Sequence, residues 1–186
     1  YGCLGTLNIY NLNLLLCYSI NCSEIEVGLR YMIDISLICI FVTFLFKIGC
    51  APFHFWVPDV YEGAPLSSSI IISIIPKIAI FYTFIKINSS IHSFFIDLKE
   101  TLLFFGLLSS IVGTFFALTQ TRIKRLILYS SISQIGFLII ALGVNSLQSL
   151  TSLYFFLIVY LISSLIIWGH LSSFLNFQTR LNLFQS

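Results

Sequence analysis

Five stretches of this sequence are long and apolar enough to cross a lipid bilayer. They are residues 33–56, 66–87, 102–118, 126–142 and 150–168. A helix needs about 20 mostly apolar residues to cross the ~30 Å hydrocarbon core. Hydrophobic residues make up 58% of the chain and charged residues only 9%. Because backbone polar groups in lipid must be satisfied inside the protein, the sequence predicts an all-α integral membrane fold with about five transmembrane helices.

The runs also suggest how the chain is organised. Residues 1–32 are interrupted by Asn, Glu and Arg side chains, so we place them outside the hydrocarbon core as an interfacial segment. Two predicted spans fall in residues 33–94, and three spans with a tail fall in residues 95–186. Trp56 and Trp168 end two of the runs and fit an aromatic belt at the membrane surface.

Charge and motif content exclude several classes of protein. The net charge is +2 and dispersed, which argues against a nucleic-acid-binding surface. The five cysteines contain no CxxC and no paired His spacing, so we predict neither a metal site nor a disulfide framework. No Walker loop, dinucleotide fingerprint or catalytic triad is present. We therefore expect no redox or hydrolytic chemistry, and no bound cofactor or metal, in this chain.

Two lysines stand inside the first two apolar runs. Lys47 and Lys77 are each about ten residues from the nearer end of their run, or ~15 Å along a helix. A lysine at the bilayer centre costs about 2.5–3.5 kcal/mol on insertion scales. We expect both lysines to face a protein interior that holds water or a carboxylate, where a lysine can exchange a proton near neutral pH. A fixed ion pair between helices is the alternative.

Prolines accompany these lysines. Pro52 lacks a backbone N–H and would leave the Ile48 carbonyl without its helical partner, so we predict a broken helix beside Lys47. His54 is either a proton relay or an ordinary hydrogen-bonding residue. The stretch VPDVYEGAP, residues 57–65, is predicted to be a tight turn, and Pro76 should bend the second span.

Small and polar residues follow helical spacing in the third and fourth runs. Ser130, Ser133 and Gln134 lie at i, i+3 and i+4 and should share one face. Such a stripe either holds water in a file or joins helices by hydrogen bonds. Gly106 and Gly113, with Ser110 and Thr114, make a small-residue face suited to close helix packing.

Three stretches in this order carry a resemblance to a known family. They are FKIGCAPFHFWVPDVYEGAP, PKIAIF and ALTQTRIKRLILYSSISQIGFLIIALG. Together they resemble the antiporter-like membrane subunits of respiratory complex I, the NADH:ubiquinone oxidoreductase, and among these the chain 2 type. The similarity extends over nearly the whole chain, from just before the family's seventh helix to just after its eleventh. It implies part of a fold built from two inverted five-helix repeats, each with a broken helix and a buried lysine.

The resemblance assigns proton-translocation roles to four residues. Lys47 matches the lysine of the broken seventh helix, which pairs with a glutamate on the fifth. Lys77 matches the lysine of the eighth helix on the central polar axis, His54 the histidine of the PFH motif, and Lys124 the loop motif before the tenth helix. Gln134 stands where many relatives have a histidine. The family's fifth and twelfth helices have no counterpart here, which implies a split or shortened subunit.

The function implied by the resemblance is proton translocation coupled to NADH oxidation and ubiquinone reduction. The NADH, FMN, iron–sulfur and ubiquinone sites would belong to other subunits. The implied partners are other membrane-arm subunits, a separate polypeptide supplying the missing helices, and membrane lipids, and the implied location is the mitochondrial inner membrane. The alternatives are a subunit of a cation/proton antiporter or membrane hydrogenase, and a structural remnant that no longer pumps.

Overall fold

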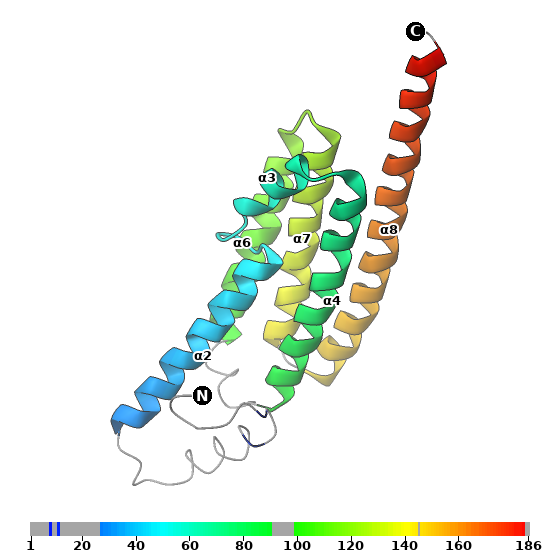
Figure 1. Ribbon diagram of the computed structural model, residues 1–186. Coiled ribbons are helices and arrows are strands. Elements are labelled where there is room, and N and C mark those ends of the chain that lie inside the picture. The colour runs from blue at the N-terminus through cyan, green and yellow to red at the C-terminus, as the bar shows by residue number, and fades with distance from the viewer. Residues whose placement is uncertain (1–7, 9–10, 12–26, 91–98, 145, 185–186) are drawn as a thin grey trace.

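The computed structural model describes residues 8, 11, 27–90, 99–144 and 146–184, and its regular structure there is entirely helical. The helices are α2 (Val27–Ile48), α3 (Trp56–Gly63), α4 (Leu66–Ser90), α6 (Lys99–Leu118), α7 (Ile123–Val144) and α8 (Leu147–Phe184). They run roughly side by side, except that α3 is short and lies near one end of the bundle (Figure 1). The all-α fold is confirmed. The predicted interfacial segment lies almost wholly outside the described residues.

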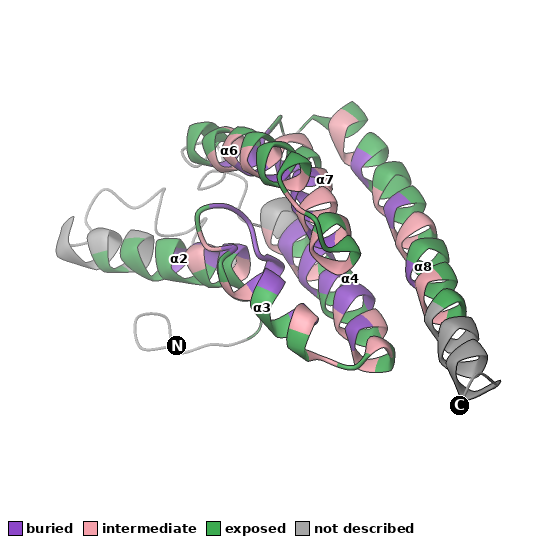
Figure 2. Cartoon of the chain, turned by 90° about the horizontal axis from the view of Figure 1, so that it is seen from above, coloured by how far each residue is buried: buried purple, intermediate pink, exposed green. Residues whose placement is uncertain are grey.

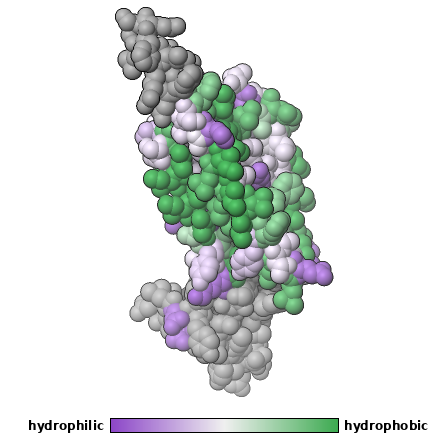
Figure 3. Space-filling model, turned by 90° about the vertical axis from the view of Figure 1, so that its right-hand side faces the viewer, coloured by the Kyte–Doolittle hydropathy of each residue, from purple (hydrophilic) through white to green (hydrophobic). Residues whose placement is uncertain are grey.

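Four of these helices are long and apolar enough to cross a membrane. These candidate spans are residues 66–87, 99–118, 123–144 and 147–174, and α2 adds a shorter apolar stretch over Ile35–Ile48. The face formed by α8 shows a wide apolar band between more polar ends (Figure 3). The exposed side chains in that band include Phe155, Ile158 and Ile162, as expected of a surface that contacts lipid chains.

Buried residues concentrate on α4 and α7, in the middle of the bundle (Figure 2). One apolar cluster surrounds Phe84, Leu138 and Leu142, and a second surrounds Tyr61 and Trp168. Trp168 is only 2% exposed, so our placement of it in an interfacial belt is wrong. Its indole lies against the Tyr61 ring instead, with the ring centroids 6.4 Å apart.

Glycines allow α6 and α7 to approach closely. A Cβ on Gly113 would lie 2.5 Å from the backbone N of Ser133, and a Cβ on Gly136 would lie 2.7 Å from the carbonyl of Gly106. The predicted small-residue face therefore packs two helices together. Its serine is the fully buried Ser109, because Ser110 is only half-buried and Thr114 is exposed.

The first predicted span is broken, as expected. Helix α2 ends at Ile48, and Gly49 adopts a positive φ of 79°, a conformation that glycine adopts without steric cost. Pro52 follows within the break, and the chain becomes helical again at Trp56. The Trp56 indole Nε1 donates to the carbonyl of Phe46 at 3.0 Å, so the two halves are joined across the break.

The stretch predicted as a tight turn is instead the helix α3. Pro58 is its third residue, where a missing N–H costs nothing because the first N–H groups have no partner within a helix. Asp59 in the first turn interacts favourably with the helix dipole. Val57, Pro58 and Tyr61 form the buried face. Prolines and a glycine at its ends made this segment resemble a loop.

Candidate functional site: a lysine between two cavities

Lys77 occupies the centre of the bundle, with only 7% of its surface exposed. It projects from the middle of α4 toward α7 and α8. Its Nζ donates to the Tyr160 hydroxyl on α8 and lies 3.5 Å from the Ser131 hydroxyl on α7. Three helices therefore meet at one buried amine.

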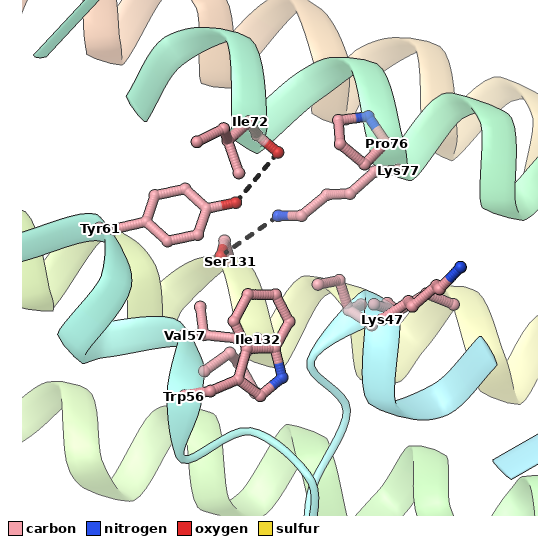
Figure 4. A pocket seen from close by; sticks show the side chains of 11 residues that line it. Lys47, Trp56, Val57, Tyr61, Ile72, Pro76, Lys77, Ser131 and Ile132 are labelled. Carbon is pink, nitrogen blue, oxygen red and sulfur yellow. Dashed lines mark hydrogen bonds between the residues drawn. The ribbon is translucent and has the colours of Figure 1, made fainter. Parts of the chain in front are cut away.

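A cavity lies on each side of Lys77. The first, of about 60 Å³, lies between the broken helix, α4 and α7, and is lined by Lys47, Tyr61 and Pro76 among others (Figure 4). The second, of about 30 Å³, lies between α4, α7 and α8. Its polar lining consists of Ser73, Lys77, Ser130, Ser131, Gln134, Tyr160, Ser163 and Ser164. Since one water needs ~10–15 Å³, each cavity has room for water.

Lys77 and Ser131 line both cavities, so they form the boundary between them. Within the described part of the chain, no carboxylate lines either cavity. The ammonium of Lys77 is thus held by hydroxyl groups alone, which do not neutralise its charge. A buried charge without an opposite charge is costly.

Pro76 shapes the first cavity. It stands inside α4, which continues through it, and its missing N–H leaves the carbonyl of Ile72, four residues earlier, without a helical donor. The Tyr61 hydroxyl donates to that carbonyl at 3.1 Å (Figure 4). Helix α3 is thereby attached to α4 one turn from Lys77.

Lys47 reaches the same cavity in a different way. It lies in the last turn of α2, and its side chain lines the first cavity while its ammonium points away from Lys77 (Figure 4). The residue is exposed in this chain. The structure brings Lys47 and Lys77 to one cavity but does not face their ammonium groups toward each other, and no described carboxylate pairs with Lys47.

His54 lies in the break and is 5% exposed. Its ring stacks on Phe55 with centroids 4.5 Å apart and approaches the rings of Phe116 and Tyr129 at 6.4 Å. Its Nδ1 atom has no hydrogen-bond partner among the described residues. His54 lines neither cavity, so the structure separates it from the two lysines.

Lys124 also lies apart from the cavities. It lies in the first turn of α7, and its Nζ donates to the carbonyl of Ala64 at 3.4 Å. Beside it, Arg122 and Arg125 both form ion pairs with Glu62 of α3. The segments at this end therefore lie together, and Lys124 belongs to a group of contacts that holds α3 against α7.

The predicted polar stripe divides between two surfaces. Ser130 and Gln134 line the second cavity, whereas Ser133 is buried against Gly113 of α6. Sequence reasoning missed Ser131, which the structure places at Lys77. It also missed Tyr160. The available signal was a tyrosine in the middle of an apolar run, since a buried tyrosine usually finds a hydrogen-bond partner.

A proline-broken helix beside a buried lysine is the arrangement that ion-coupled membrane transporters use at their sites. The chain matches a family described as "NADH:quinone oxidoreductase/Mrp antiporter, TM" over residues 1–185. It belongs to this family. The arrangement typical of ion-coupled membrane transporters therefore agrees with the antiporter-like family that the sequence motifs indicated.

Similar proteins indicate which type of subunit within the family the chain resembles. NADH-quinone oxidoreductase subunit N of Francisella tularensis subsp. holarctica is 36% identical over 178 residues, which are 93% of this chain and 35% of the relative. NADH-ubiquinone oxidoreductase chain 2 of Rhizopus oryzae is 38% identical over 154 residues, 82% of this chain and 29% of that protein. The chain thus spans about a third of the length of these relatives.

Proposed function

We propose that this chain is part of a membrane-arm subunit of a proton-translocating NADH:quinone oxidoreductase. The single observation that carries the proposal is Lys77, which is buried, lines both cavities and is held by hydroxyls, with no carboxylate beside it among the described residues. The relatives are named as subunits of NADH-quinone and NADH-ubiquinone oxidoreductases, which supports the assignment to such a complex. Other subunits of the complex are then its partners, and lipid covers the exposed apolar face.

In this proposal Lys77 takes up a proton from the first cavity and releases it into the second. Lys47 controls the step electrostatically. When the Lys47 ammonium turns toward the first cavity with no carboxylate beside it, it disfavours a charged Lys77, because like charges repel, and a carboxylate paired with Lys47 removes that repulsion. The carboxylate would come from outside the described residues. We propose a separate polypeptide as its source, in keeping with the implied split subunit.

The redox steps would take place elsewhere in the complex. Among the described residues no group of three His, Cys, Asp or Glu side chains could hold a metal ion. NADH, FMN, iron–sulfur clusters and quinone are therefore proposed to bind other subunits. We propose the mitochondrial inner membrane as the location, because nineteen Phe and a single Met suit an AT-rich organellar gene. Separating the cell's membranes and detecting the chain by mass spectrometry tests this.

The proposal is tested by replacing Lys77 with Met in the assembled complex. NADH-driven proton uptake into sealed vesicles, normalised to assembled complex, should be lost because Met cannot carry a proton. Lys86→Met is the matched control, since Lys86 lies on the same helix and is exposed. Uptake at the wild-type rate in Lys77→Met, with assembly unchanged, would contradict the proposal.

A second candidate function rests on a specific observation. Gln134 lines the second cavity and cannot change its protonation state, so a scaffold that no longer pumps would also fit. In that case Lys77→Met would leave pumping by the complex intact. An antiporter or hydrogenase subunit is distinguished differently, because its purified complex would lack NADH-oxidising subunits.

A further inference from the structure

Tyr160 is the polar group on α8 that reaches Lys77. It lies in the middle of the candidate span 147–174 and is 4% exposed. The Lys77 Nζ atom lies next to the Tyr160 hydroxyl and 5.1 Å from the ring centroid, so it meets the hydroxyl end of the ring and not its face. The same tyrosine lines the second cavity but not the first.

A tyrosine hydroxyl can form a hydrogen bond with a lysine whether the lysine is protonated or neutral. An ammonium has only donors, so the phenolic oxygen accepts a hydrogen bond from it and keeps its own O–H for another acceptor. A neutral amine has a lone pair, and the same O–H can then donate to that lone pair. Tyr160 therefore stays hydrogen-bonded to Lys77 whether or not Lys77 carries the extra proton.

The serines around the second cavity are less free to act in this way. The hydroxyls of Ser130 and Ser131 donate to backbone carbonyls of α7 at 2.7 Å each. Those of Ser163 and Ser164 donate to carbonyls of α8 at 2.9 Å each. The Tyr160 hydroxyl makes no hydrogen bond to a backbone carbonyl in the part of the chain that is described, so its proton can turn toward the cavity.

We propose that Tyr160 passes the proton of Lys77 to water in the second cavity, an inference that rests on the proton-translocating function proposed above. The Lys77 N–H bond breaks as an O–H bond forms on Tyr160, while the original Tyr160 O–H bond breaks and its proton joins a cavity water. Lys77 ends neutral, Tyr160 ends unchanged, and one proton has moved into the second cavity. Rotation of the hydroxyl then restores the starting hydrogen bond.

The test is Tyr160→Phe in the assembled complex, because Phe keeps the ring and removes only the oxygen. NADH-driven proton uptake per assembled complex should fall about 100-fold or more, within the range that a positioned proton-transfer group contributes. The remaining uptake should show a larger solvent deuterium isotope effect than the wild type, which a role in packing alone would not produce. Tyr154→Phe is the matched control, since Tyr154 lies on the same helix and is 49% exposed.

Comparing Tyr160→Phe with Lys77→Met separates the role of Tyr160 from the proposed function. Normal uptake in Tyr160→Phe beside lost uptake in Lys77→Met would overturn the role of Tyr160 and leave the proposed function standing. Normal uptake in Lys77→Met would overturn both. Failure of Tyr160→Phe to assemble would show that the hydroxyl holds helices together, which also counts against the proposal.

Discussion

At the scale of single residues, the distance between α6 and α7 depends on positions that lack a side chain. Gly106 and Gly113 on α6 and Gly136 on α7 each bring backbone within the space that a Cβ would occupy. Backbone atoms of the facing helix lie within 3.0 Å of each added Cβ, and backbone cannot move aside as a side chain can. The glycines let α7 pack closely against α6, and this packing sets the position of the α7 serines that line the second cavity.

Gly136→Ala should destabilise the protein. The new Cβ would lie 2.5 Å from Ser109 Oγ and 2.7 Å from the carbonyl of Gly106, so the helices must separate. Overpacking of this kind costs about 1–3 kcal/mol of free energy of unfolding. Gly169→Ala is the control, because nothing lies within 4 Å of its new Cβ. The melting temperature of the purified complex should fall for Gly136→Ala only, and equal melting temperatures would contradict this packing.

At the scale of elements, two neighbouring residues of the short helix α3 attach it to α4 and to the start of α7. Tyr61 donates to the α4 carbonyl that Pro76 leaves free, and Glu62 receives Arg122 and Arg125 from the start of α7. Helix α3 closes one wall of the first cavity through Val57 and Tyr61. These contacts therefore fix the shape of the cavity that adjoins Lys77.

Glu62→Gln should loosen α3. The carboxylate is 23% exposed and receives two guanidinium groups, so its neutralisation should cost about 1 kcal/mol of stability. Asp59→Asn is the matched control on the same helix, because Asp59 is 78% exposed and lies 3.6 Å from Arg125. Limited proteolysis of the α3 region should be faster in Glu62→Gln than in Asp59→Asn. Equal rates would show that these ion pairs do not hold α3.

The sequence predicted the elements better than their contacts. Runs of apolar residues set the spans, and Pro52 with Gly49 set the break, because these features act locally along the chain. Burial of Lys77 followed from its position in a span. That Tyr160 meets Lys77 did not follow, because the two residues are 83 positions apart and the contact depends on how α8 packs against α4. Trp168 was misplaced for the same reason.

At the scale of the whole molecule, two small cavities share Lys77 and Ser131 in their lining, inside an otherwise apolar bundle. The outer face is suited to lipid, whereas the interior carries a row of hydroxyls from α4, α7 and α8. Lys47 also lines the first cavity, and its ammonium points away from Lys77 (Figure 4). A neighbouring helix with a carboxylate at that position would complete the row, in keeping with the relatives' threefold greater length.

The central claim is that Lys77 acts by exchanging a proton and not merely by carrying a charge. Lys77→Arg separates these two properties, because arginine keeps the positive charge but does not lose its proton in proteins. The measurement is the number of protons taken up per NADH oxidised in vesicles that contain the assembled complex. We predict that Lys77→Arg lowers this ratio as much as Lys77→Met does. A wild-type ratio in Lys77→Arg would contradict proton exchange at Lys77.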